Sequence, residues 1–178
     1  QYLLLPMHIS AATIQDIPAL TELINSAYRG EASKKGWTTE ADLLKGDLRT
    51  DIPTLTELIS NTKAIILKHS LADGTIAGCV YLEQRERGLY LGMLTVSPQM
   101  QAAGMGKKLL ATAETYAKQN SCTNIFMNVI TLRTELINWY ERNGYVQTVE
   151  RVPMPDNPKF GIPTQPLEFV IMEKIIAS

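Results

Sequence analysis

The order strand, helix, strand between residues 89 and 130 constrains the fold of this chain more than any other feature. A largely apolar run from Leu89 to Val96 stops just before Pro98, which cannot continue a strand interior. A helical pattern covers residues 104 to 119, and residues 124 to 130 return as an apolar strand. Two strands that are joined through a helix lie parallel, because a tight turn joins only antiparallel strands. The chain is therefore predicted to combine helices with a sheet that contains a parallel pair.

The elements on either side of this crossover are predicted to be helices first and antiparallel strands afterwards. Before the crossover we expect a strand over 8–12, helices over 13–28, over 39–46 and from Thr54 onward, and strands over 64–69 and 76–82. After it we expect a helix over 133–143 and strands over 145–152 and 167–174. Thr13 with Asp16, and Thr54 with Glu57, have the spacing of residues that close a helix N-terminus.

Length and charge exclude several classes of protein. The 178 residues suffice for one substantial core, so we expect a single domain over 1–178, with 1–6 as an extension or remnant. Lys and Arg total 17 against 18 Asp and Glu, and this balance argues against nucleic acid as a partner. Apolar stretches are far shorter than the roughly 20 residues that span a bilayer, so we expect a cytoplasmic protein with no membrane partner. Cys79 and Cys122 form no C-x-x-C pair, and we expect no metal.

The loop that precedes the crossover helix has the chemistry of an anion site. The first turn of a helix has N–H groups without partners and carries about half a positive charge. Gly104 and Gly106 would let an anion approach these groups, and Lys107 and Lys108 would add positive charge. Taken alone, two glycines are also compatible with a simple tight turn.

Two motifs resemble those of a known family. V-x-P followed by Q-x-x-G-x-G, from Val96 to Gly106, resembles the acetyl-CoA motif of the GNAT superfamily of N-acetyltransferases. The segment from Leu136 to Tyr145 resembles the second motif of that family, a helix that carries a Tyr and ends at Gly-aromatic. The loop lacks the Lys-Ser/Thr ending of ATP-binding loops and the G-x-G-x-x-G of dinucleotide folds.

The resemblance implies a fold and a cofactor. The fold is α/β with α+β layers, a mixed and mostly antiparallel sheet of about six to seven strands flanked by helices, whose central parallel pair splays to bind CoA. The cofactor is acetyl-CoA. The residues that the resemblance assigns to it are Leu94, Thr95, Val96, Gln101, Ala102, Ala103, Gly104, Met105, Gly106, Lys107, Asn128 and Arg133. The strand residues contribute backbone contacts, the loop and helix start hold the pyrophosphate, and Arg133 replaces an Asn that the family often has.

The implied activity is transfer of an acetyl group to an amine by direct attack in a ternary complex. Tyr140 would protonate the leaving thiolate, although an aromatic residue beside Trp139 also suits simple helix packing. The amine must lose a proton, and Glu83 is the nearest candidate base; a solvated surface charge is the alternative for it. Both histidines, His8 and His69, are expected on the surface.

The acceptor is the part of the function that the sequence defines least. Tyr28 and Trp37 are predicted either as walls of the acceptor pocket or as ordinary packing residues, and the Pro-rich segment 153–166 either as a lid or as a fixed loop. The acceptor is an amine, on a small molecule or a peptide. Exposed edge strands would also allow a homodimer. The alternative to an enzyme is a non-catalytic acyl-CoA-binding module that regulates a partner.

Overall fold

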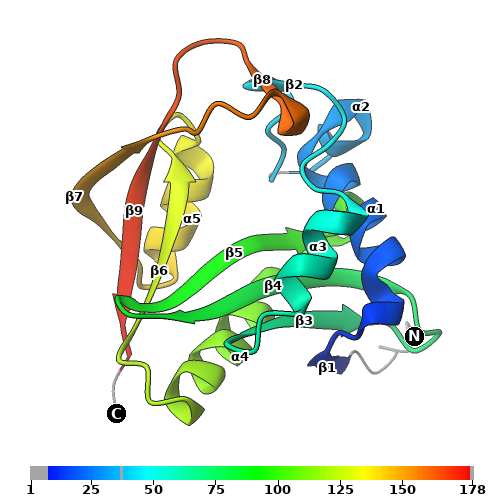
Figure 1. Ribbon diagram of the computed structural model, residues 1–178, viewed down its shortest axis with the longest axis vertical. Coiled ribbons are helices and arrows are strands. Elements are labelled where there is room, and N and C mark those ends of the chain that lie inside the picture. Colours follow the sequence, from blue (N-terminus) through cyan, green and yellow to red (C-terminus); the bar gives the residue numbers. More distant parts are fainter. Residues whose placement is uncertain (1–7, 37, 177–178) are drawn as a thin grey trace.

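One mixed sheet dominates the fold (Figure 1). The computed structural model describes residues 8–36 and 38–176. In this part of the chain seven strands pair in the order β1 (His8–Ala11), β3 (Ala64–Ser70), β4 (Ile76–Arg85), β5 (Gly88–Val96), β6 (Asn124–Ile130), β9 (Glu168–Ile175) and β7 (Val146–Pro153). Only the pair β5–β6 is parallel, and every other pair is antiparallel. The predicted fold class is confirmed.

Helices cover both faces of the sheet. The helices are α1 (Ile17–Tyr28), α2 (Gly30–Ser33), α3 (Ile52–Ile59), α4 (Met105–Gln119) and α5 (Thr134–Arg142), with short 3-10 turns η1 (Ile14–Asp16), η2 (Pro98–Ala103) and η3 (Pro158–Phe160). Side chains alternate between the faces of a strand. Leu82 of β4 accordingly belongs to the buried cluster under α4 and α5, whereas its neighbour Tyr81 belongs to the cluster under α1 and α3. No helix of the described ranges has the length and apolar character needed to cross a bilayer.

The parallel pair opens after two residues. Leu89 pairs with Ile125 and Tyr90 with Phe126, and beyond this point β5 remains on β4 while β6 remains on β9. Figure 1 shows the two halves of the sheet diverging from this pair. The split leaves one edge of each central strand without a strand neighbour. Such edges have backbone groups that a bound molecule can use.

A bulge in β5 lies at this split. Cys79 pairs with Thr95 and Tyr81 with Gly92, so three steps along β5 match two along β4. Met93, inside the extra length, has a φ of 49°. Residues other than glycine rarely have a positive φ, and those that do are concentrated at functional sites. The bulge therefore changes the direction of the β5 backbone where the parallel pair separates.

The segment predicted as a helix over 39–46 is not helical, and this prediction was wrong. Residues 41–43 form turns, and β2 (Leu44–Lys45) pairs with β8 (Ile162–Pro163) of the Pro-rich segment. The strand pairing of Leu44 with Pro163, which is distant in the sequence, is therefore preferred over the helix that the local pattern predicts. The helix predicted from Thr54 exists but starts earlier, because Asp51 caps it by accepting from the Thr54 N–H at 2.9 Å.

His69 is buried, against the prediction of a surface position. Its strand β3 lies inside the sheet between β1 and β4, and its exposed fraction is 1%. Burial, with a smaller contribution from the nearby charge of Lys108, lowers the pKa of the His69 imidazole below its ordinary value. The folded protein therefore favours the neutral imidazole.

The burial of His69 predicts a loss of stability in acid. Because the pKa is lower in the folded state, the unfolded chain binds the proton more readily. Stability from this site is present above pH 6.5 and falls as the pH drops through the folded-state pKa. His69→Gln should show a smaller change in the free energy of unfolding between about pH 7.5 and about pH 5 than the wild type. His8→Gln, which removes an exposed imidazole, should follow the wild-type curve in urea titrations; an unchanged pH dependence for His69→Gln would contradict the account.

Candidate active site

A cavity of about 280 Å³ lies where the two central strands separate. Its walls are β5 from Tyr90 to Leu94, β6 from Met127 to Ile130, the end of α1, one face of α5 and part of segment 154–161. We call it the central cavity. Among the residues that the sequence predicts for the site, those that line it are Tyr28, Leu94, Asn128, Arg133 and Tyr140. Segments far apart in the chain therefore supply one site, as the motifs imply.

Tyr28 connects the end of α1 to the bulge of β5. Its hydroxyl donates a hydrogen bond to the backbone carbonyl of Leu94. The Tyr28 ring is buried, and burial raises the pKa of its hydroxyl to about 12, so the group remains a donor. Thr95 is fully buried beside it and donates to the Met93 carbonyl at 2.8 Å, which supports the bulge from within. Val96 is buried and lies outside the lining of the central cavity.

Tyr140 of α5 lies on the wall of the central cavity. Its ring packs edge-on against Trp139, with 5.2 Å between ring centroids, and against Tyr145, with 5.7 Å. Burial holds the pKa of the Tyr140 hydroxyl well above its ordinary value. Within the described ranges the hydroxyl has no hydrogen-bond partner in the protein, so its proton is available to a ligand. Asn128 is the exposed residue of an otherwise buried strand, and its side chain lines the same cavity.

The start of α4 has the features of an anion site. Gly104 is its N-cap, with a φ of +75°, and a Cβ built there would meet nothing within 4 Å. The Lys108 N–H bonds to the Gly104 carbonyl at 3.2 Å, and the three N–H groups before it belong to the first turn, where an α-helix provides no intrahelical partner. Met105 and Gly106 are buried under this end, and Lys107 and Lys108 are exposed beside it. The side chains of Gln101, Ala102 and Ala103 lie outside the described part of the structure, and so does Trp37.

Glu83 is not placed on the wall of the central cavity. Its carboxylate accepts from Arg85 at 3.1 Å and from the Tyr81 hydroxyl at 2.8 Å. The Arg85 guanidinium, helped by the Tyr81 bond, lowers the pKa of Glu83. The role of Glu83 as a base therefore stays a prediction, with its carboxylate ionised but already paired.

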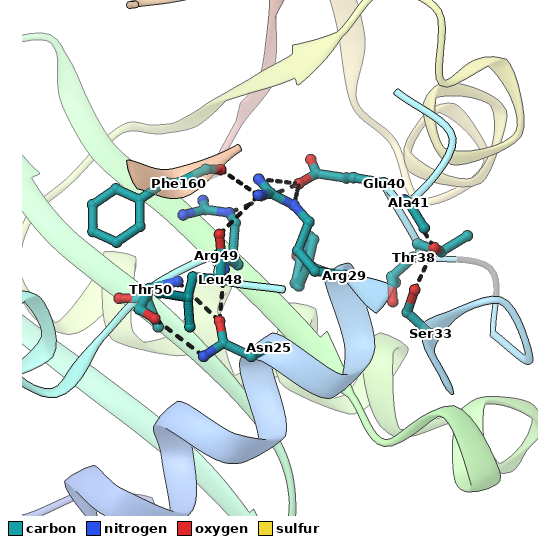
Figure 2. Close-up of polar contacts among 12 residues, drawn as sticks. Asn25, Arg29, Ser33, Thr38, Glu40, Ala41, Leu48, Arg49, Thr50 and Phe160 are labelled. Carbon is teal, nitrogen blue, oxygen red and sulfur yellow. Dashed lines mark hydrogen bonds and ion pairs between the residues drawn. The ribbon is translucent and has the colours of Figure 1, made fainter. Parts of the chain in front are cut away.

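Four charged side chains line the central cavity, and the motifs identify only one of them, Arg133. They are Arg133 and the three residues Arg29, Glu40 and Arg49, which Figure 2 shows. Arg133 donates to Glu40 at 3.2 Å and to the Thr38 carbonyl, so its guanidinium is held by an internal ion pair. No spacing rule in the sequence connects Arg29 to Glu40 or Arg49. Arg29 follows α1, Glu40 and Arg49 lie on either side of β2, and Arg133 precedes α5, so the fold brings these charges together from separate parts of the chain.

Segment 153–166, predicted as a lid or a fixed loop, is tied to the rest of the protein. The Phe160 carbonyl accepts from Arg29, and β8 pairs with β2. Lys159 forms an ion pair with Asp51 at 2.6 Å, and this pair lowers the pKa of Asp51 to about 2. These contacts favour the fixed loop. Residues of this segment between Met154 and Gly161 form part of the wall of the central cavity.

The arrangement of split strands, helix end and tyrosine can be compared with known proteins. The model of the acetyltransferase (GNAT) family matches residues 18–145. The chain belongs to this family. The resemblance inferred from the two motifs is confirmed.

A curated relative agrees with this membership, and solved structures share the fold. The amino-acid acetyltransferase of Ralstonia nicotianae is 30% identical over 149 residues, which are 82% of this chain and 28% of that protein. The chain therefore spans little more than a quarter of that relative. The crystal structure of the ribosomal-protein-S18-alanine N-acetyltransferase from Escherichia coli has a TM-score of 0.71 at 14% identity and covers 97% of this chain and 96% of its own. A putative acetyltransferase from Salmonella typhimurium, solved with its cofactor acetyl-CoA, has a TM-score of 0.69 at 17% identity, covering 97% and 95%.

Proposed function

We propose that this protein transfers an acetyl group from acetyl-CoA to the amine of a small acceptor, by direct attack in a ternary complex. One observation carries the proposal: the separating strands β5 and β6 and the side of α5 that bears Tyr140 line the same cavity. A relative of the same fold was solved with acetyl-CoA. Family membership supports the reaction class.

The residues present fit acetyl-CoA. The start of α4 with Gly104 and Lys107 would hold the pyrophosphate, because open amides and a cation meet there. The β5 backbone near Leu94 and Val96, with Asn128 across the split, would hold the pantetheine arm. When bound, acetyl-CoA supplies an activated acyl group. A fixed backbone N–H at the bulge would stabilise the charge that develops on the carbonyl oxygen, an effect of about 3 kcal/mol.

Tyr140 would hold the proton that the departing thiolate needs. Its raised pKa keeps the hydroxyl protonated at neutral pH. Direct transfer also agrees with the cysteines: Cys79 is buried, burial raises its pKa to about 12, and neither it nor Cys122 lines the central cavity. A covalent acyl-enzyme therefore has no suitable thiol among the residues that form the cavity.

The acceptor amine must reach the cavity in its neutral form. Glu83 remains the candidate base from the sequence, and Glu83→Gln tests it. If Glu83 is the base, the substitution should cause a large fall in kcat/KM and should change the acidic side of the pH dependence of kcat/KM. A water molecule as the proton acceptor would leave both nearly unchanged.

The second candidate function is a non-catalytic acyl-CoA-binding module. The absence of a carboxylate from the predicted strand carrying the thioester contacts, Leu89 to Val96, favours it. The position of Tyr140 opposes it, because a binding module has no use for a buried proton donor at this point.

Release of CoA thiol separates the two functions. The purified protein is incubated with acetyl-CoA and a panel of primary amines, and we expect thiol release that depends on the amine. With the best acceptor, initial velocities at varied concentrations of both substrates should give intersecting lines, as a ternary complex requires, and parallel lines would indicate a covalent intermediate. Thiol release that stays at the background rate for every amine would favour the binding module.

Two further expectations remain proposals. A homodimer would use an edge strand such as β7, which exposes Val149 and Val152, and the molar mass in solution tests it. A cytoplasmic location is tested by cell fractionation.

A further inference from the structure

The acceptor end of the central cavity carries an excess of positive charge. Three arginines, Arg29, Arg49 and Arg133, line it together with one acid, Glu40. No other Asp, Glu, Lys or His of the described residues lines the cavity. Buried charges are normally paired, because removing them from water is costly. One carboxylate among three guanidinium groups leaves the site without matching negative charge.

Two of the three arginines are occupied by the protein itself. Arg29 donates to Oε1 of Glu40 at 3.1 Å, to the Leu48 carbonyl at 2.8 Å and to the Phe160 carbonyl. Arg133 donates to Oε2 of Glu40 at 3.2 Å. Both oxygens of Glu40 are thereby in use. These contacts tie α1, the turn before β2 and α5 together around the cavity.

Arg49 differs from the other two arginines in its hydrogen bonding. Its Nε lies 4.0 Å from Oε1 of Glu40, which is an ion pair but too far for a hydrogen bond. Among the described residues its guanidinium donates no hydrogen bond. Its side chain is 32% exposed and lines the cavity, with its Cζ 5.6 Å from the centre of the Tyr28 ring.

The backbone of Arg49 is held in place by α1. The Asn25 side-chain oxygen accepts from the N–H groups of Arg49 at 2.6 Å and Thr50 at 3.0 Å, and its amide donates to the Thr50 carbonyl at 3.1 Å (Figure 2). The guanidinium therefore extends from a fixed backbone. A planar fork of N–H donors from a fixed backbone suits a carboxylate, which accepts two parallel bonds.

Tyr28 relates Arg49 to the proposed site of acetyl transfer. The guanidinium lies over the Tyr28 ring, with its Cζ 5.6 Å from the ring centre, and the hydroxyl of the same ring donates to the Leu94 carbonyl at the β5 bulge. The Arg49 guanidinium and the β5 strand therefore both lie against the Tyr28 side chain, so the separation between them is short. An acceptor that spans this separation must be short, with its anionic group close to its amine.

We propose that the acceptor is a free amino acid, whose carboxylate is bound by Arg49 while its amine is directed toward β5. This inference rests on the proposed function and names its substrate class. The fixed arginines contribute a second effect, because neighbouring cations favour the neutral amine over the ammonium form. A peptide N-terminus and a polyamine both lack the carboxylate that the site would bind.

The test compares each amino acid with its own carboxamide as an acceptor, using CoA thiol release by the full chain. The two compounds differ only in the group that faces Arg49. The carboxamide has the less basic amine, as peptide α-amino groups do, so basicity alone favours it. We expect the acids to have kcat/KM values roughly 10- to 100-fold above those of the amides, as expected for hydrogen bonds to a charged group.

Substitution of Arg49 gives the matching result from the protein side. Arg49→Gln should raise KM for the amino acid by roughly 10- to 100-fold. The KM for the carboxamide should stay at its wild-type value. Arg49→Lys, which keeps the charge without the fork, should lie between the two. Arg142→Gln removes an exposed arginine on α5 and should change neither value. The affinity for acetyl-CoA, measured by calorimetry, should be the same in all four proteins.

The outcomes separate this inference from the proposed function. Equal or better turnover of amides, peptides or polyamines by the wild type overturns the amino-acid site and leaves the acetyltransferase intact. Equal loss for acid and amide in Arg49→Gln also overturns it. Binding of acetyl-CoA without thiol release from any amine overturns the proposed function, and the inference with it.

Discussion

Gly104→Val is expected to weaken acetyl-CoA binding by roughly 100-fold or more, since it removes hydrogen bonds to a charged group. Gly104 has a φ of +75°, a conformation that a β-branched residue adopts only with strain. The new side chain would also project into the open space through which a pyrophosphate approaches the first turn of α4. The backbone strain and the added side chain both affect the N–H groups of the first turn of α4. Calorimetric titration with acetyl-CoA measures the loss.

Gly74→Val is the matched control for this substitution. Gly74 lies in the turn between β3 and β4, has a φ of +87°, and likewise has nothing within 4 Å of a built Cβ. Gly74→Val therefore imposes a backbone strain similar to that of Gly104→Val, but away from the proposed site. We expect a lower melting temperature with unchanged acetyl-CoA affinity. If Gly104→Val bound acetyl-CoA as tightly as Gly74→Val, the start of α4 would not be the pyrophosphate site.

Tyr140→Phe should lower kcat by about 100- to 1,000-fold, in the range of general acid catalysis, while acetyl-CoA affinity stays the same. The substitution removes one oxygen and keeps the ring that packs between Trp139 and Tyr145. Because the folded protein raises the pKa of this hydroxyl, Tyr140 stays protonated well above neutral pH. Wild-type kcat should therefore show no loss from Tyr140 ionisation between about pH 6 and about pH 9.

Tyr116→Phe is the control for the loss of a tyrosine hydroxyl. Tyr116 lies on α4, packs at the edge of the main core and does not line the central cavity. The kcat of the Tyr116→Phe variant should equal that of the wild type. An unchanged kcat and pH profile in Tyr140→Phe would remove the proton-donor role and leave Tyr140 as a packing residue.

The fold could be predicted where local pattern and long-range pairing agree. Pro98, the helix from Gly104 and the apolar strand 124–130 require a crossover, and β5 and β6 are parallel as expected. Residues 39–46 show the opposite case. Thr39 to Leu44 has a helical pattern, but β2 pairs with β8, and Glu40 is used by Arg29 and Arg133. No local pattern contains information about partners that arrive from elsewhere in the chain.

The lining of the central cavity, which is the candidate site, could be predicted where a motif fixes the backbone. Leu94, Asn128 and Tyr140 line one cavity because each occupies a defined position on β5, β6 or α5. Arg49 could not be found in this way. Its position depends on Asn25 holding an irregular segment against α1, and a single asparagine in a helix gives no sign of such a role. His69 was misplaced for a related reason, since polarity indicates a surface while strand order decides burial.

The mass of an acceptor after incubation with the protein and acetyl-CoA tests the central claim most directly. We predict an amine heavier by one acetyl group, formed in equal amount with free CoA thiol and strongly reduced with Tyr140→Phe. The amide product would show that the central cavity supports transfer. Tight acetyl-CoA binding with no acetylated product from any amine would contradict the account and leave a protein that binds acetyl-CoA without using it.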